Sequence, residues 1–436
     1  MAGRPAGCVD RKVEETGLNA PLRERTGPSR FILAGLRLVR MRNLADGILP
    51  LDGRRSNVLV LVGPNGAGKT SLLEAVSLLA PGRGLRGARF AELLRFGEDG
   101  HLGWRVEAAL DTPHAGRHEL VVAGRVTEGA GAPAADADEP GEEEAHETVA
   151  GFRRLIEIDG RRRSPAALGG IARVLWLTPA MDRLFAGPAA ERRRFLDRVV
   201  LTLHPGNARL ALAFERTMRA RNRLLGEAGV RADASWLAAL EAKMAEAATA
   251  IAAARVEAVA QWSAMLAHRP LDGFPSPLLG LAGTLEEQLA AGAPALEVEE
   301  AYREALAAGR ARDAEAGRTL TGPHRTDLRV AAADGGNEGQ VVPAHFCSTG
   351  EQKALLLALV LGHAELIAGV EGAAPILLLD EVAAHVDEDR RSRLFARLAA
   401  LDGEVWVTGT DEAVFAPLIR EHGADRWQVA EGCIRP

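Results

Sequence analysis

The sequence is poor in aromatic residues, which make up 4% of its 436 residues, and Tyr302 is its only tyrosine. A nucleic-acid surface built from stacked aromatic rings is therefore not expected. Cysteine is also rare, and Cys8, Cys347 and Cys433 form no CxxC spacing. They predict neither a disulfide framework nor a zinc site, which is typical of a reducing compartment. Long apolar runs of about 18 residues and an apolar signal core are missing as well, so we expect a cytoplasmic protein without a membrane partner.

Lysine is scarce too, because Lys12, Lys69, Lys243 and Lys353 are the only lysines in the chain. Because lysines are so few, one inside a glycine-rich loop is less expected by chance. The net charge of −6 conceals an acidic segment, 128–147, that contains neither lysine nor arginine. The rest of the chain is slightly positive, and arginine supplies nearly all of that charge.

The distribution of apolar residues predicts an α/β lobe built from both ends of the chain. We expect this lobe to cover 30–180 and 318–436, with a helical, short coiled-coil-like domain over 181–317 inserted between the two parts. Polar residues with scattered glycine and proline predict that 1–29 is a disordered N-terminal extension. The acidic segment 128–150, rich in alanine, glycine and proline, reads as a disordered insert in the lobe.

One part of the helical domain carries an apolar stripe with spacings of three and four. The stripe consists of Leu237, Leu240, Met244, Ala247, Ile251, Ala254 and Ala258. Such a heptad pattern requires a partner helix, which 297–317 could supply by folding back. An ordinary bundle core and a projecting arm are equally compatible with the pattern.

A glycine-rich loop, "GPNGAGKT" over 63–70, fits G-x-x-x-x-G-K-[ST] at every fixed position. It follows a predicted strand and opens a predicted helix, the context in which this motif holds phosphates. We expect Lys69 to reach the β- and γ-phosphates of ATP and Thr70 to ligate Mg²⁺. A glycine turn that only begins a helix is the alternative. The predicted cofactor-binding residues here are Gly63, Pro64, Asn65, Gly66, Ala67, Gly68, Lys69, Thr70 and Ser71.

A second motif, "ILLLDE" over 376–381, is an apolar strand that ends in two acids. Asp380 is expected to serve the metal, and Glu381 to orient or deprotonate the attacking water. Buried strands often end in acids, so this motif is informative only together with the glycine loop. Lys69, Asp380 and Glu381 are the predicted catalytic residues.

A third motif, "STGEQKALLLALVLGHAEL" over 348–366, places Ser348, Thr349, Gly350 and Gln352 at the mouth of a long apolar helix. A helix N-terminus bearing serine and glycine is a potential second anion site. One chain does not need two γ-phosphate cradles, but two chains arranged head-to-tail do. An N-capped core helix is the alternative.

Together these motifs resemble those of the ABC-type ATPases, and the length of the insert separates the subclasses. The insert is longer than that of transporter ATPases and shorter than the coiled coils of SMC-type proteins. Several local stretches resemble the RecF family of bacterial recombinational repair ATPases. They are "LRLVRMRNL", "NVLVLVGPNGAGKTSLLEAVSLLAPGRGLRG", "ERRRFLDRVVLTLHPGNARLALAFERTMRARNRLL", "TGPHRTDLRV" and the segment from "FCSTGEQKALLLALVLGHAELI" to "PILLLDEVAAHVDEDRRSRLFARL".

The resemblance implies a function in DNA replication, recombination, repair and the SOS response. It implies an ATP-dependent homodimer that binds DNA at single-strand gaps and duplex junctions, without sequence specificity, together with RecO- and RecR-like proteins. The implied activity is weak, DNA-stimulated ATP hydrolysis without nuclease activity. By the same resemblance Arg42 approaches the nucleotide, Ser348 to Gln352 act on the partner's ATP, and Asp387 occupies the D-loop position.

The chain also departs from these families. Met41-Arg42-Asn43 stands where the family has Phe-Arg-Asn, and no glutamine occurs before Gln261 to fill the usual metal-contacting position. At the usual switch-histidine position the chain has Thr408-Gly409-Thr410-Asp411. An OLD-type, nuclease-related ATPase, a transport ATPase and an inactive scaffold remain as alternative functions.

Arginine clusters are the candidate DNA-binding residues, and solvated, salt-bridged helices are the alternative for each. The clusters are Arg161, Arg162 and Arg163; Arg192, Arg193, Arg194 and Arg198; Arg216, Arg219, Arg221 and Arg223; and the segment 81–89. In "GPHRTDL", His324 and Arg325 either sense the nucleotide or pack the protein interior.

Overall fold

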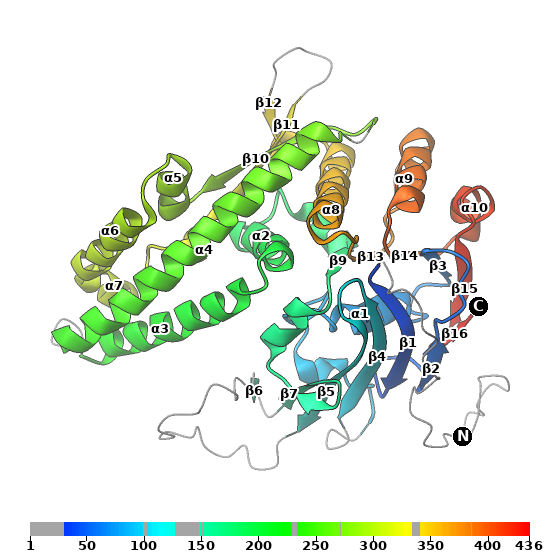
Figure 1. Ribbon diagram of the computed structural model, residues 1–436, viewed down its shortest axis with the longest axis horizontal. Coiled ribbons are helices and arrows are strands. Elements are labelled where there is room, and N and C mark those ends of the chain that lie inside the picture. Colours follow the sequence, from blue (N-terminus) through cyan, green and yellow to red (C-terminus); the bar gives the residue numbers. More distant parts are fainter. Residues whose placement is uncertain are drawn as a thin grey trace. The chain divides into compact units, whose positions relative to one another are not determined.

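The protein was analysed as a computed structural model, which describes residues 30–98, 103–126, 148–149, 152–228, 233–270, 272–333, 341–384 and 386–436. The chain forms two compact units, one of Met1–Pro179 with Ile367–Pro436 and one of Ala180–Leu366 (Figure 1). The extension 1–29 and the acidic residues 128–147, both predicted to be disordered, lie outside the described residues. Residues 148–149, placed in the same insert by the prediction, instead form a short strand, β6 (Thr148–Val149).

The first unit contains a six-stranded sheet whose inner strands are parallel. Its order is β16-β15-β3-β14-β13-β9. The strands are β3 (Val58–Val62), β9 (Val174–Leu177), β13 (Ile376–Leu379), β14 (Val405–Gly409), β15 (Asp425–Ala430) and β16 (Cys433–Arg435). Every residue of β3, β9, β13 and β14 is buried, as expected for strands covered on both faces. Because β3 comes from one end of the chain and β13 and β14 from the other, the predicted assembly of an α/β lobe from both ends is confirmed.

An antiparallel sheet completes the first unit, in the order β2-β1-β4-β5-β7-β6 with β8 beside β7. The strands other than β6 are β1 (Ile32–Val39), β2 (Gly47–Pro50), β4 (Trp104–Thr112), β5 (Gly116–Val126), β7 (Phe152–Ile158) and β8 (Arg161–Arg162). The hairpin predicted at Asp159-Gly160 joins β7 to β8. Both turn residues have positive φ, 52° and 73°, which matches the twist of a two-residue hairpin.

The described residues of the first unit include the helices α1 (Lys69–Ser77), α9 (Glu388–Ala400) and α10 (Glu412–Arg420). Helix α1 packs on β14 and β9, whereas α10 packs on α9 and β3. Short 3-10 turns cover Phe90–Leu93 and Pro165–Gly170.

The second unit is mainly helical. Its helices are α2 (Ala189–Leu203), α3 (Asn207–Ala228), α4 (Ala234–His268), α5 (Thr284–Ala290), α6 (Ala295–Ala308), α7 (Arg310–Ala316) and most of α8 (Thr349–Glu371). Short 3-10 turns cover Pro323–Arg325 and Ala344–Phe346, and another, Pro179–Arg183, begins at the junction of the units.

The predicted stripe of α4 lies in the core of a helical bundle. Met244, Ile251 and neighbouring alanines of α4 form one buried cluster with Phe214 of α3 and with Tyr302 and Leu306 of α6. The segment 297–317 does supply a partner, because α6 packs along α4, but α3 packs there as well. Of the two open interpretations, the bundle core is the one that the structure has.

The boundary of the helical unit differs from the expected one on its C-terminal side. The first boundary falls after Pro179, close to the expected position, but the chain leaves the helical unit only at Leu366 rather than near 317. The reason is strand pairing that the apolar pattern did not indicate. The three-stranded sheet of β10 (Ser276–Ala282), β11 (Asp327–Ala333) and β12 (Val341–Pro343) ties the following segment to the helices.

Helix α8 is long and apolar enough to cross a membrane, judged by length and composition alone. Its most apolar 18-residue window has a mean hydropathy of 1.8, and 78% of that window is buried inside the protein. The indole N–H of Trp262 donates to the carbonyl oxygen of Leu359 at 3.1 Å, so α8 contacts the bundle through its backbone. These contacts are those of a core helix.

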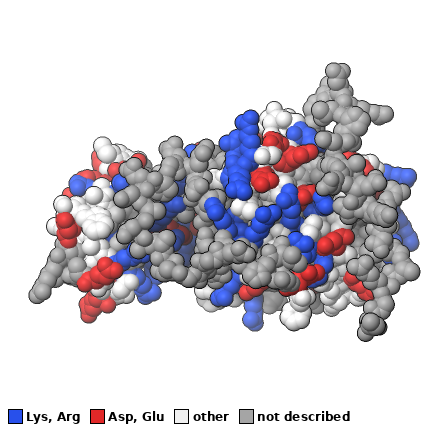
Figure 2. All heavy atoms as spheres, turned by 90° about the horizontal axis from the view of Figure 1, so that it is seen from below, with Lys and Arg blue, Asp and Glu red and all other residues white. Residues whose placement is uncertain are grey.

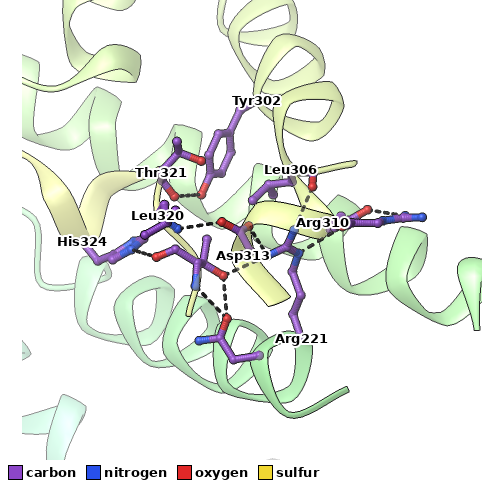
Figure 3. A network of polar contacts seen from close by, with 11 residues as sticks. Arg221, Tyr302, Leu306, Arg310, Asp313, Leu320, Thr321 and His324 are labelled. Carbon is purple, nitrogen blue, oxygen red and sulfur yellow. Dashed lines mark hydrogen bonds and ion pairs between the residues drawn. The ribbon is translucent and has the colours of Figure 1, made fainter. Parts of the chain in front are cut away.

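A buried network around Arg221 joins four helices of the second unit. The Arg221 side chain is 0% exposed, and it donates to Glu241 at 3.0 Å, Asp313 at 2.7 Å, Thr319 at 3.0 Å and the carbonyl oxygen of Leu306 at 2.8 Å (Figure 3). A buried guanidinium requires this many acceptors, since its charge is otherwise uncompensated. Arg221 therefore has a structural role and is not a free phosphate-binding residue.

The segment 321–327, "TGPHRTD", closes the same region (Figure 3). The Tyr302 hydroxyl donates to the carbonyl oxygen of Thr321 at 2.9 Å, and His324 Nε2 lies 3.0 Å from the carbonyl oxygen of Thr319. The His324 ring also packs against Phe214, with 5.7 Å between centroids. Burial lowers the pKa of His324 below its ordinary value and so favours the neutral imidazole. For His324, these contacts favour the packing interpretation.

Replacing the buried arginine should unfold the helical unit more easily than replacing an exposed one on the same helix. Arg221→Met leaves Glu241 and Asp313 buried with less compensation, and we expect a loss of about 3–5 kcal/mol in the free energy of unfolding, measured in urea. Arg219→Met is the matched control, because Arg219 is 66% exposed and its ion-pair partner among the described residues is the exposed Glu215; it should cost about 0.5 kcal/mol or less. Equal losses would contradict the structural role of Arg221.

Candidate nucleotide-binding site

The loop 63–68 connects β3 to α1 and has a shape that only glycine permits at two points. A Cβ on Gly63 would lie 2.0 Å from the carbonyl oxygen of Val429, on the neighbouring strand β15. Gly68 has φ 114° and caps α1 without a side-chain hydrogen bond. The first amides of α1 therefore keep their N–H groups for a ligand, and the helix dipole adds positive potential at the same end.

Lys69 begins α1 and is 4% exposed. Its ammonium donates to the carbonyl oxygens of Gly63 at 2.7 Å and Pro64 at 3.0 Å, so the side chain folds back over the loop. Burial lowers the pKa of Lys69, while the nearby carboxylates of Glu381 and Asp380 act in the opposite direction. The site thus holds a desolvated cation beside a backbone cradle, which suits a polyanionic ligand.

Asp380 lies directly after β13 and accepts hydrogen bonds from two hydroxyl groups. Thr70 Oγ1 donates to its two carboxylate oxygens, at 3.1 and 2.9 Å, and Thr408 Oγ1 donates to Oδ1 at 2.7 Å. The Thr70–Asp380 pair predicted as metal ligands is therefore brought together, although the two residues are 310 positions apart. Oxygen ligands of this kind suit Mg²⁺.

Glu381 has a left-handed backbone, with φ 52°. This conformation costs a residue with a Cβ roughly 1–2 kcal/mol, and such strain gathers at functional sites. The N–H of Glu381 donates to Thr408 Oγ1 at 3.0 Å. The strained peptide is thereby fixed to the same hydroxyl that binds Asp380.

Arg42, expected to approach the nucleotide, forms a bidentate ion pair with Glu74 of α1. Its Nε and Nη2 donate to the carboxylate of Glu74 at 2.9 and 3.0 Å. Glu74 is 0% exposed, and Arg86 lies 3.6 Å from the same carboxylate. The guanidinium of Arg42 is thus held against the loop's own helix.

The sequence motifs did not single out Asn43 or Thr408, which the structure places beside the predicted residues. The Asn43 amide donates to the carbonyl oxygen of Gly66 at 2.7 Å, and its oxygen accepts from the Ser71 hydroxyl at 2.8 Å. Asn43, in the segment that follows β1, therefore supports the glycine loop through Gly66 and Ser71. The sequence pointed to Asn43 through the "RMRN" stretch, which resembles a family motif. It pointed to Thr408 only because threonine stands there where a histidine is usual.

The end of β9, the last strand before the helical unit, lies next to Asp380. Strand β9 pairs with β13 in parallel, with Leu177 opposite Leu379, and the N–H of Asp380 donates to the carbonyl oxygen of Leu177 at 2.9 Å. The residue that follows β9 is Thr178, which is 7% exposed. This edge of the sheet therefore carries a hydroxyl rather than an amide.

At the far end of α1, Arg154 of β7 binds the chain that leaves the helix. Its guanidinium donates to the carbonyl oxygens of Leu78 at 2.8 Å and Ala80 at 3.3 Å, and also to that of Gly82. The side chain is 2% exposed and lies over the Phe90 ring, 5.6 Å from its centroid. The arginine-containing segment 81–89 is thus fastened to α1 and to the antiparallel sheet.

The predicted second anion site lies in the other unit, at the start of α8. Ser348 and Glu351 form a capping box: the Ser348 hydroxyl and N–H donate to the Glu351 carboxylate at 2.7 and 2.8 Å, and the Glu351 N–H donates back at 3.3 Å. Ser348, Thr349 and Gly350 are exposed, whereas Gln352 is buried and donates to the carbonyl oxygen of Cys347 at 2.9 Å.

Asp387 caps helix α9 of the first unit. Its carboxylate accepts from the N–H of Arg390 at 2.9 Å. The residue is exposed, as a contact to a second chain would require.

Two arginines of α2, Arg192 and Arg193, hold the segment 323–327 in place. Arg192 forms a bidentate pair with Asp327 at 2.8 and 2.9 Å, which raises its pKa, and Arg193 donates to the carbonyl oxygen of Thr326 at 3.0 Å. Arg198 is desolvated, and burial lowers its pKa to about 10. For these residues the salt-bridged or packed alternative holds.

The arginines of the β7–β8 hairpin differ, because Arg161, Arg162 and Arg163 are all exposed. None of the three forms a salt bridge with any residue that the structure describes. Figure 2 shows basic side chains gathered around the middle of one face, with acidic side chains between them. Charge density alone therefore does not select a DNA site, and exposed arginines that form no salt bridge with a described residue are the better candidates.

The fold and this site define an α/β P-loop lobe of the ABC type with an inserted helical domain. Among solved structures, that of the recombination mediator protein RecF with ATPrS matches with a TM-score of 0.74 at 19% identity, covering 94% of this chain and 99% of that one. The structure of RecF with ATP gives the same TM-score at 18% identity, with the same coverage. The predicted fold class is confirmed by this likeness.

Sequence relatives identify the family. The DNA replication and repair protein RecF of Rhizobium meliloti is 47% identical over 393 residues, covering 90% of this chain and 96% of the relative. The protein of the same name from Mesorhizobium japonicum is 46% identical over 394 residues, covering 90% and 95%. No protein-family model matches the chain. The chain belongs to the RecF family of DNA replication and repair proteins, which confirms the resemblance found in its motifs.

The close approach at Gly63 gives a test of the loop geometry. Gly63→Ala should lower the free energy of unfolding by about 1–3 kcal/mol, because a Cβ has no room beside the Val429 carbonyl. Thermal unfolding followed by circular dichroism measures the loss. Gly47→Ala is the matched control, since a Cβ there meets nothing within 4 Å. If the two variants unfolded at the same temperature, the described packing of β3 against β15 would be wrong.

Proposed function

We propose that the chain binds ATP and Mg²⁺ at the loop 63–70 and hydrolyses the nucleotide slowly. The observation that carries this proposal is the convergence of Lys69, Thr70 and Asp380 at one edge of the sheet. The backbone cradle, which a Cβ at Gly63 would fill, fits a row of phosphate oxygens. Membership of the RecF family supports the same nucleotide, because relatives of this fold have been solved with ATP.

In the bound state, Lys69 would exchange the carbonyl oxygens of Gly63 and Pro64 for phosphate oxygens. Thr70 and Asp380 would hold Mg²⁺, whose charge offsets that of the phosphates. Glu381, beside Asp380, is the candidate to position and deprotonate water. Asn43 keeps the loop in shape through Gly66 and Ser71.

We propose further that ATP joins two copies of the chain. Ser348, Thr349, Gly350 and Gln352 of one copy would cap the nucleotide held by the other, and Asp387 would lie at the contact. In the single chain the Ser348 hydroxyl and N–H are bound to the Glu351 carboxylate. A γ-phosphate is a stronger anion, and it would replace that carboxylate at the helix mouth.

The partner class that suits this assembly is DNA at gaps and duplex junctions, together with RecO- and RecR-like proteins in the cytoplasm. Contacts would be to backbone phosphates, so DNA should stimulate hydrolysis without sequence preference. We propose no nuclease activity. Sedimentation of the protein with ATP and gapped DNA, together and separately, tests the combination, and cleavage of DNA with Mg²⁺ would instead favour an OLD-type enzyme.

Two substitutions separate nucleotide binding from dimerisation. Lys69→Arg should abolish ATP-induced dimerisation in light scattering, because the longer, planar side chain does not fit the loop. Ser348→Arg should bind radiolabelled ATP in equilibrium dialysis but fail to dimerise. Ser235→Arg, at another exposed helix start, is the matched control and should behave as the wild type. Full dimerisation of both test variants would refute the shared-ATP dimer.

The hairpin arginines provide a test of DNA binding. Changing Arg161, Arg162 and Arg163 to glutamine should weaken binding and reduce the slope of log K against log salt concentration by up to about 0.9 per lost contact. Fluorescence anisotropy with labelled duplex at several salt concentrations measures both. Changing Arg216, Arg219 and Arg223 of α3 to glutamine removes the same charge. A loss confined to the α3 variant would move the DNA site to that helix.

A further inference from the structure

Thr408 is the last polar position of β14 and has 0% exposure. The three residues before it, Val405, Trp406 and Val407, are buried and apolar. A valine would therefore satisfy the strand and its packing equally well. A buried hydroxyl is unfavourable unless it is hydrogen-bonded, so the two bonds that Thr408 forms are the reason to examine it.

Both hydrogen-bonding functions of the Thr408 hydroxyl are in use. The hydroxyl proton is donated to Asp380 Oδ1 at 2.7 Å, and the oxygen accepts the N–H of Glu381 at 3.0 Å. One side chain on β14 is thus bonded to the side chain of one acid and to the main chain of the next. No single apolar residue could replace either bond.

The two bonds fix different things. The bond to Asp380 Oδ1 holds the carboxylate in the orientation in which Thr70 Oγ1 lies 3.1 Å from Oδ1 and 2.9 Å from Oδ2. The bond to Glu381 anchors a peptide whose residue has φ 52°, a conformation that needs support from its surroundings. Without the hydroxyl, Asp380 would be free to rotate and Glu381 could relax toward the ordinary right-handed or extended region.

We propose that Thr408 is a positioning residue of the ATPase site, which orients the metal-binding carboxylate of Asp380 and the water-directing residue Glu381 through a single hydroxyl. This inference rests on the proposed ATPase function. It also gives a role to the "TGTD" segment, in which the expected histidine is absent. Thr408 is fully buried, and it acts through its hydrogen bonds to the two acids.

The test compares Thr408→Val, which keeps the shape and removes the hydroxyl, with Thr408→Ser, which keeps the hydroxyl. For Thr408→Val we expect the Mg²⁺ concentration that gives half-maximal tightening of fluorescent ATP binding to rise about 10-fold or more. The turnover number for ATP should fall about 10- to 100-fold, as for other groups that orient metal ligands. Binding of the same nucleotide in EDTA should stay at the wild-type value, and Thr408→Ser should restore both Mg²⁺ dependence and turnover.

Three outcomes are decisive. Wild-type Mg²⁺ dependence and turnover in Thr408→Val would overturn the positioning role, as would a Thr408→Ser variant as impaired as Thr408→Val. If Thr408→Val does not fold, as judged by circular dichroism, Thr408→Ala removes the same hydroxyl without adding bulk and decides the comparison. A wild-type protein that neither binds nor hydrolyses ATP would instead refute the proposed function on which the inference rests.

Discussion

The hydrogen bonds from Thr70 to Asp380 join residues 310 positions apart. The first unit is organised around this contact between its N-terminal and C-terminal parts. Parallel pairing of β3, β14 and β13 brings the carboxyl ends of three strands to one edge. Each strand delivers one part of the site there: the glycine loop after β3, the two acids after β13 and Thr408 on β14. The helical unit follows β9 along the chain, and β9 pairs with β13 in the same sheet.

The second constraint on the fold is that every buried charge needs a partner. It separates the buried, hydrogen-bonded arginines from the exposed ones. Arg42, Arg154 and Arg221 are each matched by carboxylates or carbonyl oxygens in the interior. They determine where a loop, a helix end or a helix pair lies, and they are not available to DNA. The exposed arginines of the β7–β8 hairpin form no salt bridge with any residue in the described part of the chain. An arginine-rich composition is therefore a poor guide to the extent of a DNA-binding surface.

Local patterns predicted the nucleotide loop, the acidic strand end and the helical insertion, because each depends on residues adjacent in sequence. The glycines of 63–68 and the apolar run 376–379 are examples, and the structure places them as strand, loop and helix. The helical unit's second boundary was missed because β10 and β11 pair although the helices and turns of residues 283–326 lie between them. Asn43, Glu74 and Thr408 were missed for the same reason: their partners lie in other strands, and no spacing rule connects them. The roles of Arg192 and Arg193 were left open because amphipathic helices do not reveal which charges are buried.

Helix α1 has the glycine loop at one end and, at the other, the carbonyl oxygens held by Arg154. Nine residues of helix form a stiff rod about 13 Å long. Because the helix is stiff, its two ends cannot shift independently. A displacement of the glycine loop therefore also displaces the segment 81–89, which contains Arg83, Arg86 and Arg89. The glycine loop and the segment 81–89 are therefore joined through one short helix, and Arg86 adds a side-chain contact to Glu74 of that helix.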